Sequence, residues 1–256
     1  MTMQVGMVGK DGIVLVSDQL AWAKPNDSSF AHKHLGIGVT SYFGPSKLML
    51  SSDGKIAVAC AHDLRQATAL VEAIFQRLTQ EYWNSPKEKL KEITLDTLRS
   101  QKWRGASCLI VLSEPLSLYL LQCGQDEQCD VGMIGLYAFA GDSCNPATFW
   151  AHRYFLTMPP NDRTVRELLP LAAQVVVDAG RLNSGTVGGL EALYCDGSGM
   201  HVLTYEQNGE LVEAAEKRGL QIREMILAPP AFLVSSELSV PQPTTDAPSS
   251  PPPSQE

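Results

Sequence analysis

A threonine directly follows the first methionine, and this residue could supply both a nucleophile and its own base. If Met1 is removed, the hydroxyl of Thr2 lies beside a free α-amine whose reference pKa is about 7.7–8.0. Such an amine can accept the hydroxyl proton near neutral pH, which is what makes a hydroxyl an effective nucleophile. The residue type and its position therefore predict a hydroxyl nucleophile that its own amine activates. The alternative is that small second residues are common simply because they permit methionine removal.

A β-hairpin pattern begins at this threonine and would hold it in place. Apolar runs at 3–9 and 12–18 flank Gly9-Lys-Asp-Gly12, whose residues tolerate a positive φ. The first strand therefore starts at a chain end that would otherwise fray. Asp18 stands at the end of the second strand, where a turn residue is equally expected.

The rest of the chain alternates strand pairs with helix pairs. Strand patterns lie at 48–50, 56–60, 107–112, 116–122, 133–140, 190–195 and 200–205, and helical patterns lie at 63–78, 85–101, 146–155 and 164–182. Hairpin links require antiparallel strands. We therefore expect an α+β fold over residues 1–234, with two packed sheets and helices on both outer faces. The proline-, serine- and threonine-rich segment 235–256 is expected to be a disordered tail.

Composition and net charge limit the classes of binding partner. The chain has 256 residues, of which 44% are hydrophobic and 19% charged, as in an ordinary globular protein. Its net charge of −8 argues against nucleic acid or an anionic membrane surface as the main partner. Neither a membrane span nor a signal sequence is visible, so we expect a cytoplasmic protein.

The six cysteines match no common zinc-ligand spacing. We therefore expect no metal, and no cofactor is indicated either. Four of the cysteines lie in or beside strand-like apolar runs, where a reduced cysteine packs as a small core residue. Cys123 and Cys129 could form a local disulfide, which a reducing compartment disfavours.

Three blocks of sequence carry a family resemblance. They are Thr2 to Asp18, with Asp11-Gly-Ile-Val-Leu-Val-Ser-Asp18; Ser46-Lys47-Leu-Met-Leu, followed by Asp53-Gly-Lys-Ile-Ala-Val-Ala59; and Asn183-Ser184-Gly185 after a long helix. In this order and spacing they resemble proteasome β-type subunits and bacterial proteasome-like N-terminal nucleophile (Ntn) hydrolases. The resemblance implies a four-layer αββα sandwich and a threonine-type peptidase. It also implies a homo-oligomeric ring that acts on peptides or unfolded proteins.

The same resemblance implies a role for each matching residue. Thr2 would attack an amide carbonyl, with Asp18 and Lys47 on either side of it, and Ser184 would lie beside the Thr2 amine. The backbone N–H of Ala61 would donate to the oxyanion, although the family usually has glycine at that position. Taken alone, Lys47 could equally be a solvated surface lysine.

Several positions depart from the family pattern. Arg181 replaces an aspartate and reverses the charge next to the proposed amine, while Asp178 lies one helical turn earlier. Either Asp142 or Ser143 would take the place of a turn serine, and an insertion at 21–46 would border the cleft. These departures leave two alternatives open: a catalytically silent ring or scaffold subunit, and an amidase of the same fold that acts on a small amide.

The intact mass of the purified chain is expected to show that Met1 is absent, because threonine is small enough for methionine aminopeptidase to act before it. The substitution Thr2→Leu provides a control that should keep the methionine. A wild-type chain that retains Met1 has the Thr2 nitrogen locked in a peptide bond, and this result would favour the silent subunit.

Overall fold

The computed structural model describes residues 2–23, 40–43, 46–61, 64–79, 81, 84–102, 105–124, 128–141, 146–157, 159–182 and 187–228. In chain order its elements are β1 (Met3–Val8), β2 (Gly12–Ser17), β3 (Leu20–Ala23), β4 (Thr40–Phe43), β5 (Leu48–Leu50), β6 (Ile56–Ala61), α2 (Leu64–Arg77), α3 (Pro86–Gln101), β7 (Ala106–Ser113), β8 (Leu116–Cys123), β9 (Cys129–Ile134), β10 (Tyr137–Gly141), α4 (Pro146–Thr157), η2 (Pro160–Asp162), α5 (Val165–Leu182), β11 (Glu191–Asp196), β12 (Gly199–Val202) and α6 (Tyr205–Leu227). The chain divides into two compact units, Met1–Gly219 and Leu220–Glu256. The packing below is that of the first unit.

Two five-stranded antiparallel sheets form the centre of this unit. The first sheet has the order β10-β1-β2-β11-β12 and the second sheet has the order β5-β6-β7-β8-β9. The predicted hairpin joins β1 to β2 in the first sheet, with Gln4 opposite Ser17 and Val8 opposite Ile13. The Gly9 N–H closes the turn by donating to the Gly12 carbonyl at 2.7 Å.

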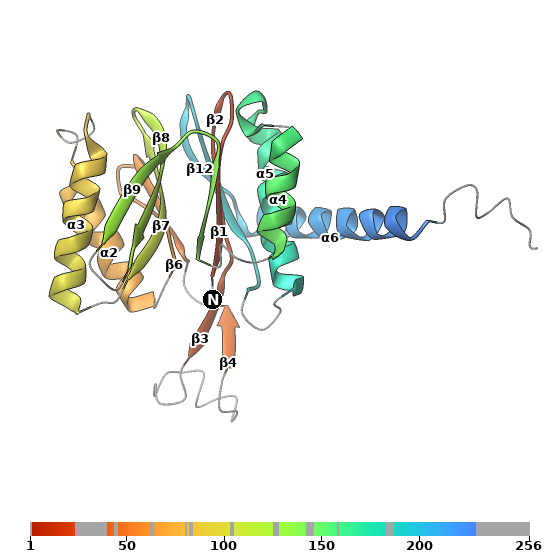
Figure 1. The fold of residues 1–256 in the computed structure, drawn as a ribbon, viewed down its shortest axis with the longest axis horizontal. Helices are drawn as coiled ribbons and strands as arrows, with labels where there is room; N and C mark the ends of the chain where they lie inside the picture. Colours follow the sequence, from red (N-terminus) through yellow and green to blue (C-terminus); the bar gives the residue numbers. More distant parts are fainter. Residues whose placement is uncertain are drawn as a thin grey trace, which may run out of the picture. The chain divides into compact units, whose positions relative to one another are not determined.

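Helices lie beside both sheets. Figure 1 shows α2 and α3 beside the second sheet, and α4 and α5 beside the first. Successive residues of a strand point to opposite faces, so the inner strands carry apolar side chains on both faces. In β7, for example, Leu109 belongs to the apolar cluster between the two sheets, whereas Ile110 belongs to the cluster under α2 and α3.

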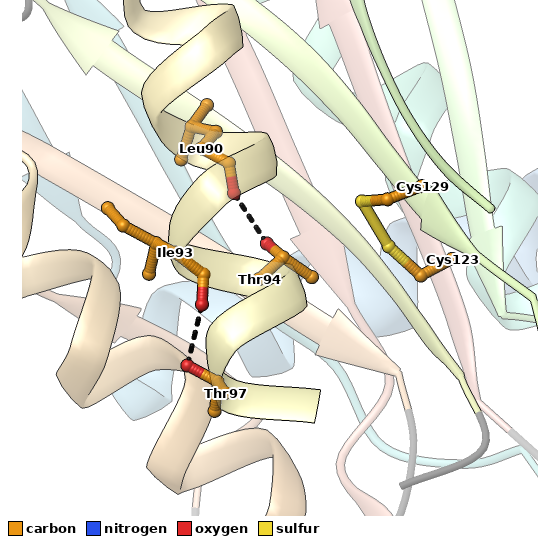
Figure 2. The surroundings of a disulfide bond; sticks show 6 residues. All are labelled: Leu90, Ile93, Thr94, Thr97, Cys123 and Cys129. Atoms are coloured by element: carbon orange, nitrogen blue, oxygen red, sulfur yellow. Dashed lines mark hydrogen bonds between the residues drawn. A yellow bond between two sulfur atoms is a disulfide. The ribbon is translucent and has the colours of Figure 1, made fainter. Parts of the chain in front are cut away.

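Helix α3 buries two threonines close to the β8–β9 hairpin (Figure 2). The Thr94 hydroxyl donates to the Leu90 carbonyl at 2.7 Å, and the Thr97 hydroxyl donates to the Ile93 carbonyl at 2.8 Å. Both hydroxyls are satisfied inside their own helix, so they can be buried without leaving an unpaired polar group.

A disulfide joins Cys123 to Cys129 across the β8–β9 hairpin (Figure 2). The two cysteines are partners in the strand register, and their Cα atoms lie 4.1 Å apart. The sequence allowed this disulfide, but the expected reducing compartment argued against it. In the described chain, the cysteines that remain free are Cys60, Cys108 and Cys195, and all three are buried.

The predicted four-layer αββα sandwich is corrected by the structure to an α+β arrangement of two antiparallel five-stranded sheets with helices. The predicted insertion at 21–46 contributes most of β3 and all of β4, which pair as a separate two-stranded sheet. These strands have four residues each, too few for an alternating pattern to be visible. Helix α6 follows β12, where the predicted pattern ended, and its Arg218 Nε donates to Gln174 of α5 at 3.2 Å.

Two further predictions concern the C-terminal tail and the absence of a membrane span. The tail at 235–256 lies outside them, so its predicted disorder stays a prediction. Of the helices that the structure does describe, none combines the length and apolar character needed to cross a membrane.

We expect Leu118→Ala to lower the free energy of unfolding by about 2–5 kcal/mol, because it leaves a cavity between the sheets. Leu118 is fully buried in the inter-sheet cluster, whereas Leu116 on the same strand is 42% exposed. Leu116→Ala is therefore the matched control, with an expected loss below about 1 kcal/mol. Chemical denaturation measures both, and equal losses would contradict this packing.

Candidate active site

Three residues predicted from the sequence meet at the start of β1. Lys47 Nζ lies 3.1 Å from Thr2 Oγ1 and 2.9 Å from Asp18 Oδ2. Thr2, Lys47 and Asp18 are 8%, 7% and 0% exposed, so this polar group is almost fully withdrawn from water. Thr2 directly precedes β1, Asp18 directly follows β2, and Lys47 directly precedes β5. The hairpin supplies the first two groups and the second sheet supplies the third.

The Asp18 carboxylate ties the start of the chain to the lysine. Its Oδ1 accepts the Met3 N–H at 2.9 Å, while its Oδ2 accepts from Lys47. The Asp18 N–H in turn donates to the Met3 carbonyl at 3.0 Å. A buried carboxylate needs such partners, because an unpaired buried charge is strongly destabilising. The geometry therefore fixes Thr2, the residue next to Met3, against Lys47.

Gly141 packs against Thr2 more closely than any other amino acid could. Its φ is +84°, and a Cβ added there would lie 2.0 Å from the Thr2 carbonyl oxygen. The residue ends β10, opposite Met3 in the register. Sequence reasoning noted the Ala140–Ser143 turn but missed this role. A glycine at the turn was the only available signal.

Ala61, the predicted oxyanion donor, lies at the same edge of the site. It ends β6, is buried, and its Cβ would lie 3.2 Å from a Cβ added to Gly141. Among the described residues, Lys102 is the one non-glycine residue with a positive φ. Ala61 therefore adopts a backbone conformation that alanine takes without strain. Its role as a donor stays a prediction.

Some of the remaining predicted residues lie outside the described residues, and the others make contacts elsewhere. Ser184, Asp142 and Ser143 lie outside the described residues. The Arg181 guanidinium donates to the Glu216 carbonyl of α6 at 3.4 Å. Asp178 accepts from Gln174 within its own helix, and burial raises the pKa of its carboxyl.

Glu191 is a buried residue that sequence reasoning missed. Its Oε1 accepts the N–H groups of Lys47 at 2.6 Å and Leu48 at 3.2 Å, and its Oε2 accepts the Ser46 hydroxyl at 2.6 Å. The Ser46 hydroxyl also contacts the Leu48 carbonyl. Burial raises the pKa of the Glu191 carboxyl, and these hydrogen bonds oppose the rise. A single glutamate at the start of a strand gives no sequence signal for such a role.

A second group of catalytic residue types occurs at the β11–β12 hairpin, but its geometry is wrong for catalysis. His201 Nε2 lies 2.8 Å from Ser198 Oγ and 3.2 Å from Asp196 Oδ1. The aspartate of a serine–histidine–aspartate triad must instead hold the other ring nitrogen. We interpret these contacts as turn-stabilising hydrogen bonds. Within the described ranges, no three His, Cys, Asp or Glu side chains form a group that could hold a metal ion.

No protein-family model and no curated protein matches the sequence. Solved structures of Anbu proteins, however, match the fold. A Gly-1 mutant of Anbu from Hyphomicrobium sp. strain MC1 has a TM-score of 0.61 at 13% identity, over 88% of this chain and 96% of that chain. Anbu from Yersinia bercovieri, an ancestral β-subunit, has a TM-score of 0.60 at 13% identity, over 89% of this chain and 98% of that chain. At such identities the likeness shows a shared fold alone.

The predicted assignment to proteasome β-type subunits and Ntn hydrolases is therefore corrected. The matching structures are Anbu proteins, and the fold likeness shows no catalysis by an N-terminal nucleophile. The sequence blocks that suggested the family are built largely from strand and turn residues, which many sequences of one fold can share. This chain is similar in fold to Anbu proteins.

Gly141→Ala is expected to lower the free energy of unfolding by about 1–3 kcal/mol, because it combines a disfavoured φ with a clash against Thr2. A methyl group added at Gly132 of β9 would meet only open space, so Gly132→Ala is the matched control and should change stability little. Chemical denaturation compares the two variants. Equal free energies of unfolding for the two variants would show that Gly141 is not in close contact with Thr2.

Proposed function

We propose that this protein is a threonine-dependent amide hydrolase that cleaves peptide bonds once removal of Met1 frees the Thr2 amine. The observation that carries the proposal is the contact of Lys47 Nζ with both Thr2 Oγ1, at 3.1 Å, and Asp18, at 2.9 Å. A hydroxyl, a cation and a carboxylate meet there with almost no exposure to water. In such a setting their electrostatic interactions are stronger than at a surface.

The proposed reaction begins when the Thr2 amine accepts the hydroxyl proton and Oγ1 attacks the substrate carbonyl carbon. Lys47 donates a hydrogen bond to this oxygen and stabilises the negative charge that develops on it. The C–N bond then breaks, the leaving amine takes up the proton, and an ester to Thr2 remains. Water hydrolyses the ester and regenerates the hydroxyl. Asp18 orients Lys47 and balances its charge.

We assign stabilisation of the tetrahedral oxyanion to the backbone N–H of Ala61. The position of Ala61 beside Gly141, which itself touches Thr2, supports this assignment. We also retain Ser184 as the proposed partner of the Thr2 amine.

The charge reversal at Arg181 is one of the departures that favour a catalytically silent subunit. The Arg181 side chain contacts α6, and this weakens the argument, because its charge is drawn to the Glu216 carbonyl. The proposal therefore favours an active enzyme. We further propose peptides or unfolded chains as substrates and a homo-oligomeric ring as the assembly. The cytoplasmic location stays a prediction, and the Cys123–Cys129 disulfide counts against a reducing compartment. The likeness in fold to an ancestral β-subunit supports the ring.

The proposal predicts that Thr2→Ala abolishes hydrolysis of short fluorogenic peptides, with a loss of about 10³-fold or more. Thr2→Ser should keep part of the activity, because it retains a hydroxyl next to the amine. Thr94→Ala is the matched control, since the hydroxyl of this buried threonine donates to the Leu90 carbonyl of its own helix. An electrophilic peptide inhibitor should add covalently to Thr2, which mass spectrometry detects. Unchanged turnover in Thr2→Ala would refute both a peptidase and a small-amide hydrolase that use this residue.

A further inference from the structure

We infer that Glu191 is a positioning residue: it holds the main chain at Lys47 so that the ammonium group reaches Thr2 and Asp18. The inference rests on the proposed function for its kinetic consequence. The placement of Lys47 can be measured without it.

The Glu191 carboxylate accepts hydrogen bonds from the chain around Lys47. One oxygen accepts the N–H groups of Lys47 and Leu48 at 2.6 and 3.2 Å, and the other accepts the Ser46 hydroxyl at 2.6 Å. Three consecutive residues are therefore bound by one side chain. On the opposite side, the Lys47 carbonyl accepts the Cys60 N–H of β6 at 3.2 Å. The peptide groups on both sides of Lys47 are thus held in place.

Glu191 belongs to the first sheet, whereas Lys47 lies next to the second. Glu191 starts β11 of the first sheet, opposite Ser17, the residue before Asp18. Lys47 precedes β5 of the second sheet. The carboxylate therefore bridges the two sheets at the point where Thr2 and Asp18, from one sheet, must meet Lys47, from the other. Without Glu191, the backbone at Lys47 would be held on one side only, by the Cys60 N–H.

A carboxylate buried between the two sheets is energetically costly. Glu191, Ser17 and Gln4 follow one another across three paired strands, and all three are buried. The space between the sheets is otherwise filled by apolar side chains such as Leu15 and Leu109. A buried ionised group is rarely more stabilising than an apolar one of the same size. A glutamate here is therefore better explained by what it positions than by stability.

The test compares Glu191→Ala with Glu191→Gln. The glutamine oxygen can still accept from Lys47 and Leu48, and the Ser46 hydroxyl can turn to accept from the amide nitrogen. Glu114→Ala is the control, because Glu114 is exposed and bonds only the surface Lys55 among the described residues. Two quantities are measured in each variant: hydrogen exchange at the Lys47 and Leu48 amides, and kcat and KM on a fluorogenic peptide.

In Glu191→Ala, exchange at these amides should rise by about tenfold, the equivalent of one lost hydrogen bond. The kcat should fall by about 10- to 100-fold, because a displacement of roughly 1 Å at a reacting group has such an effect. The KM should stay within about threefold, since Glu191 acts through Lys47 and not on substrate. Glu191→Gln should recover both quantities to within about threefold of wild type.

Unchanged amide exchange in Glu191→Ala would overturn the inference. So would faster exchange with a wild-type kcat, which would make Glu191 a purely structural tie. If wild-type protein shows no turnover, the proposed function fails, and the inference is decided by NMR of the Lys47 ammonium. Its hydrogens must then exchange faster in Glu191→Ala than in wild type, and equal rates would refute the positioning role.

Discussion

The buried ion pair between Lys47 and Asp18 is the interaction on which the rest of the site depends. Its ammonium lies 2.9 Å from the carboxylate, and both groups are almost completely shielded from water. Loss of one partner from such a pair costs about 3–5 kcal/mol, because the other charge is left unpaired. Both members of the pair have further hydrogen bonds: the Met3 N–H donates to Asp18, and the Thr2 hydroxyl accepts from Lys47. The start of the chain is thereby tied to the second sheet.

This arrangement places polar groups where an apolar interface would be more stable. Gln4 is fully buried, and neither polar atom of its side chain has a partner in the described part of the chain. An unsatisfied buried amide typically costs about 1–3 kcal/mol. Together with Glu191, it marks the region between the sheets near Thr2 as one where stability has been sacrificed. Proteins accept such losses most often where a site must be held in one geometry.

Sequence reasoning succeeded where information was local. The hairpin register places Thr2 and Asp18 at neighbouring strand ends, whereas Lys47 was singled out by the family resemblance of a short block. Glu191 contacts Lys47 across 144 positions of sequence, so no local pattern could reveal it. The same limit explains β3 and β4, whose four-residue strands are separated by a long segment. Family membership failed for another reason: different sequences of one fold can share strand and turn patterns. The strict four-layer class was taken from the family resemblance and failed with it.

The pairing of β2 with β11 has a consequence for protein synthesis. Asp18 directly follows β2, but its neighbour β11 begins only at Glu191, so the sheet stays incomplete until most of the chain has left the ribosome. Domains fold as units, and translation proceeds at about 5–20 residues per second. The earliest-made residue of the site must therefore wait roughly ten seconds or more at that pace for its last neighbour. Until β11 has been made, the hydrogen bonds that Glu191 accepts from Lys47 and Leu48 are missing, so the surroundings of Thr2 are completed only late in synthesis.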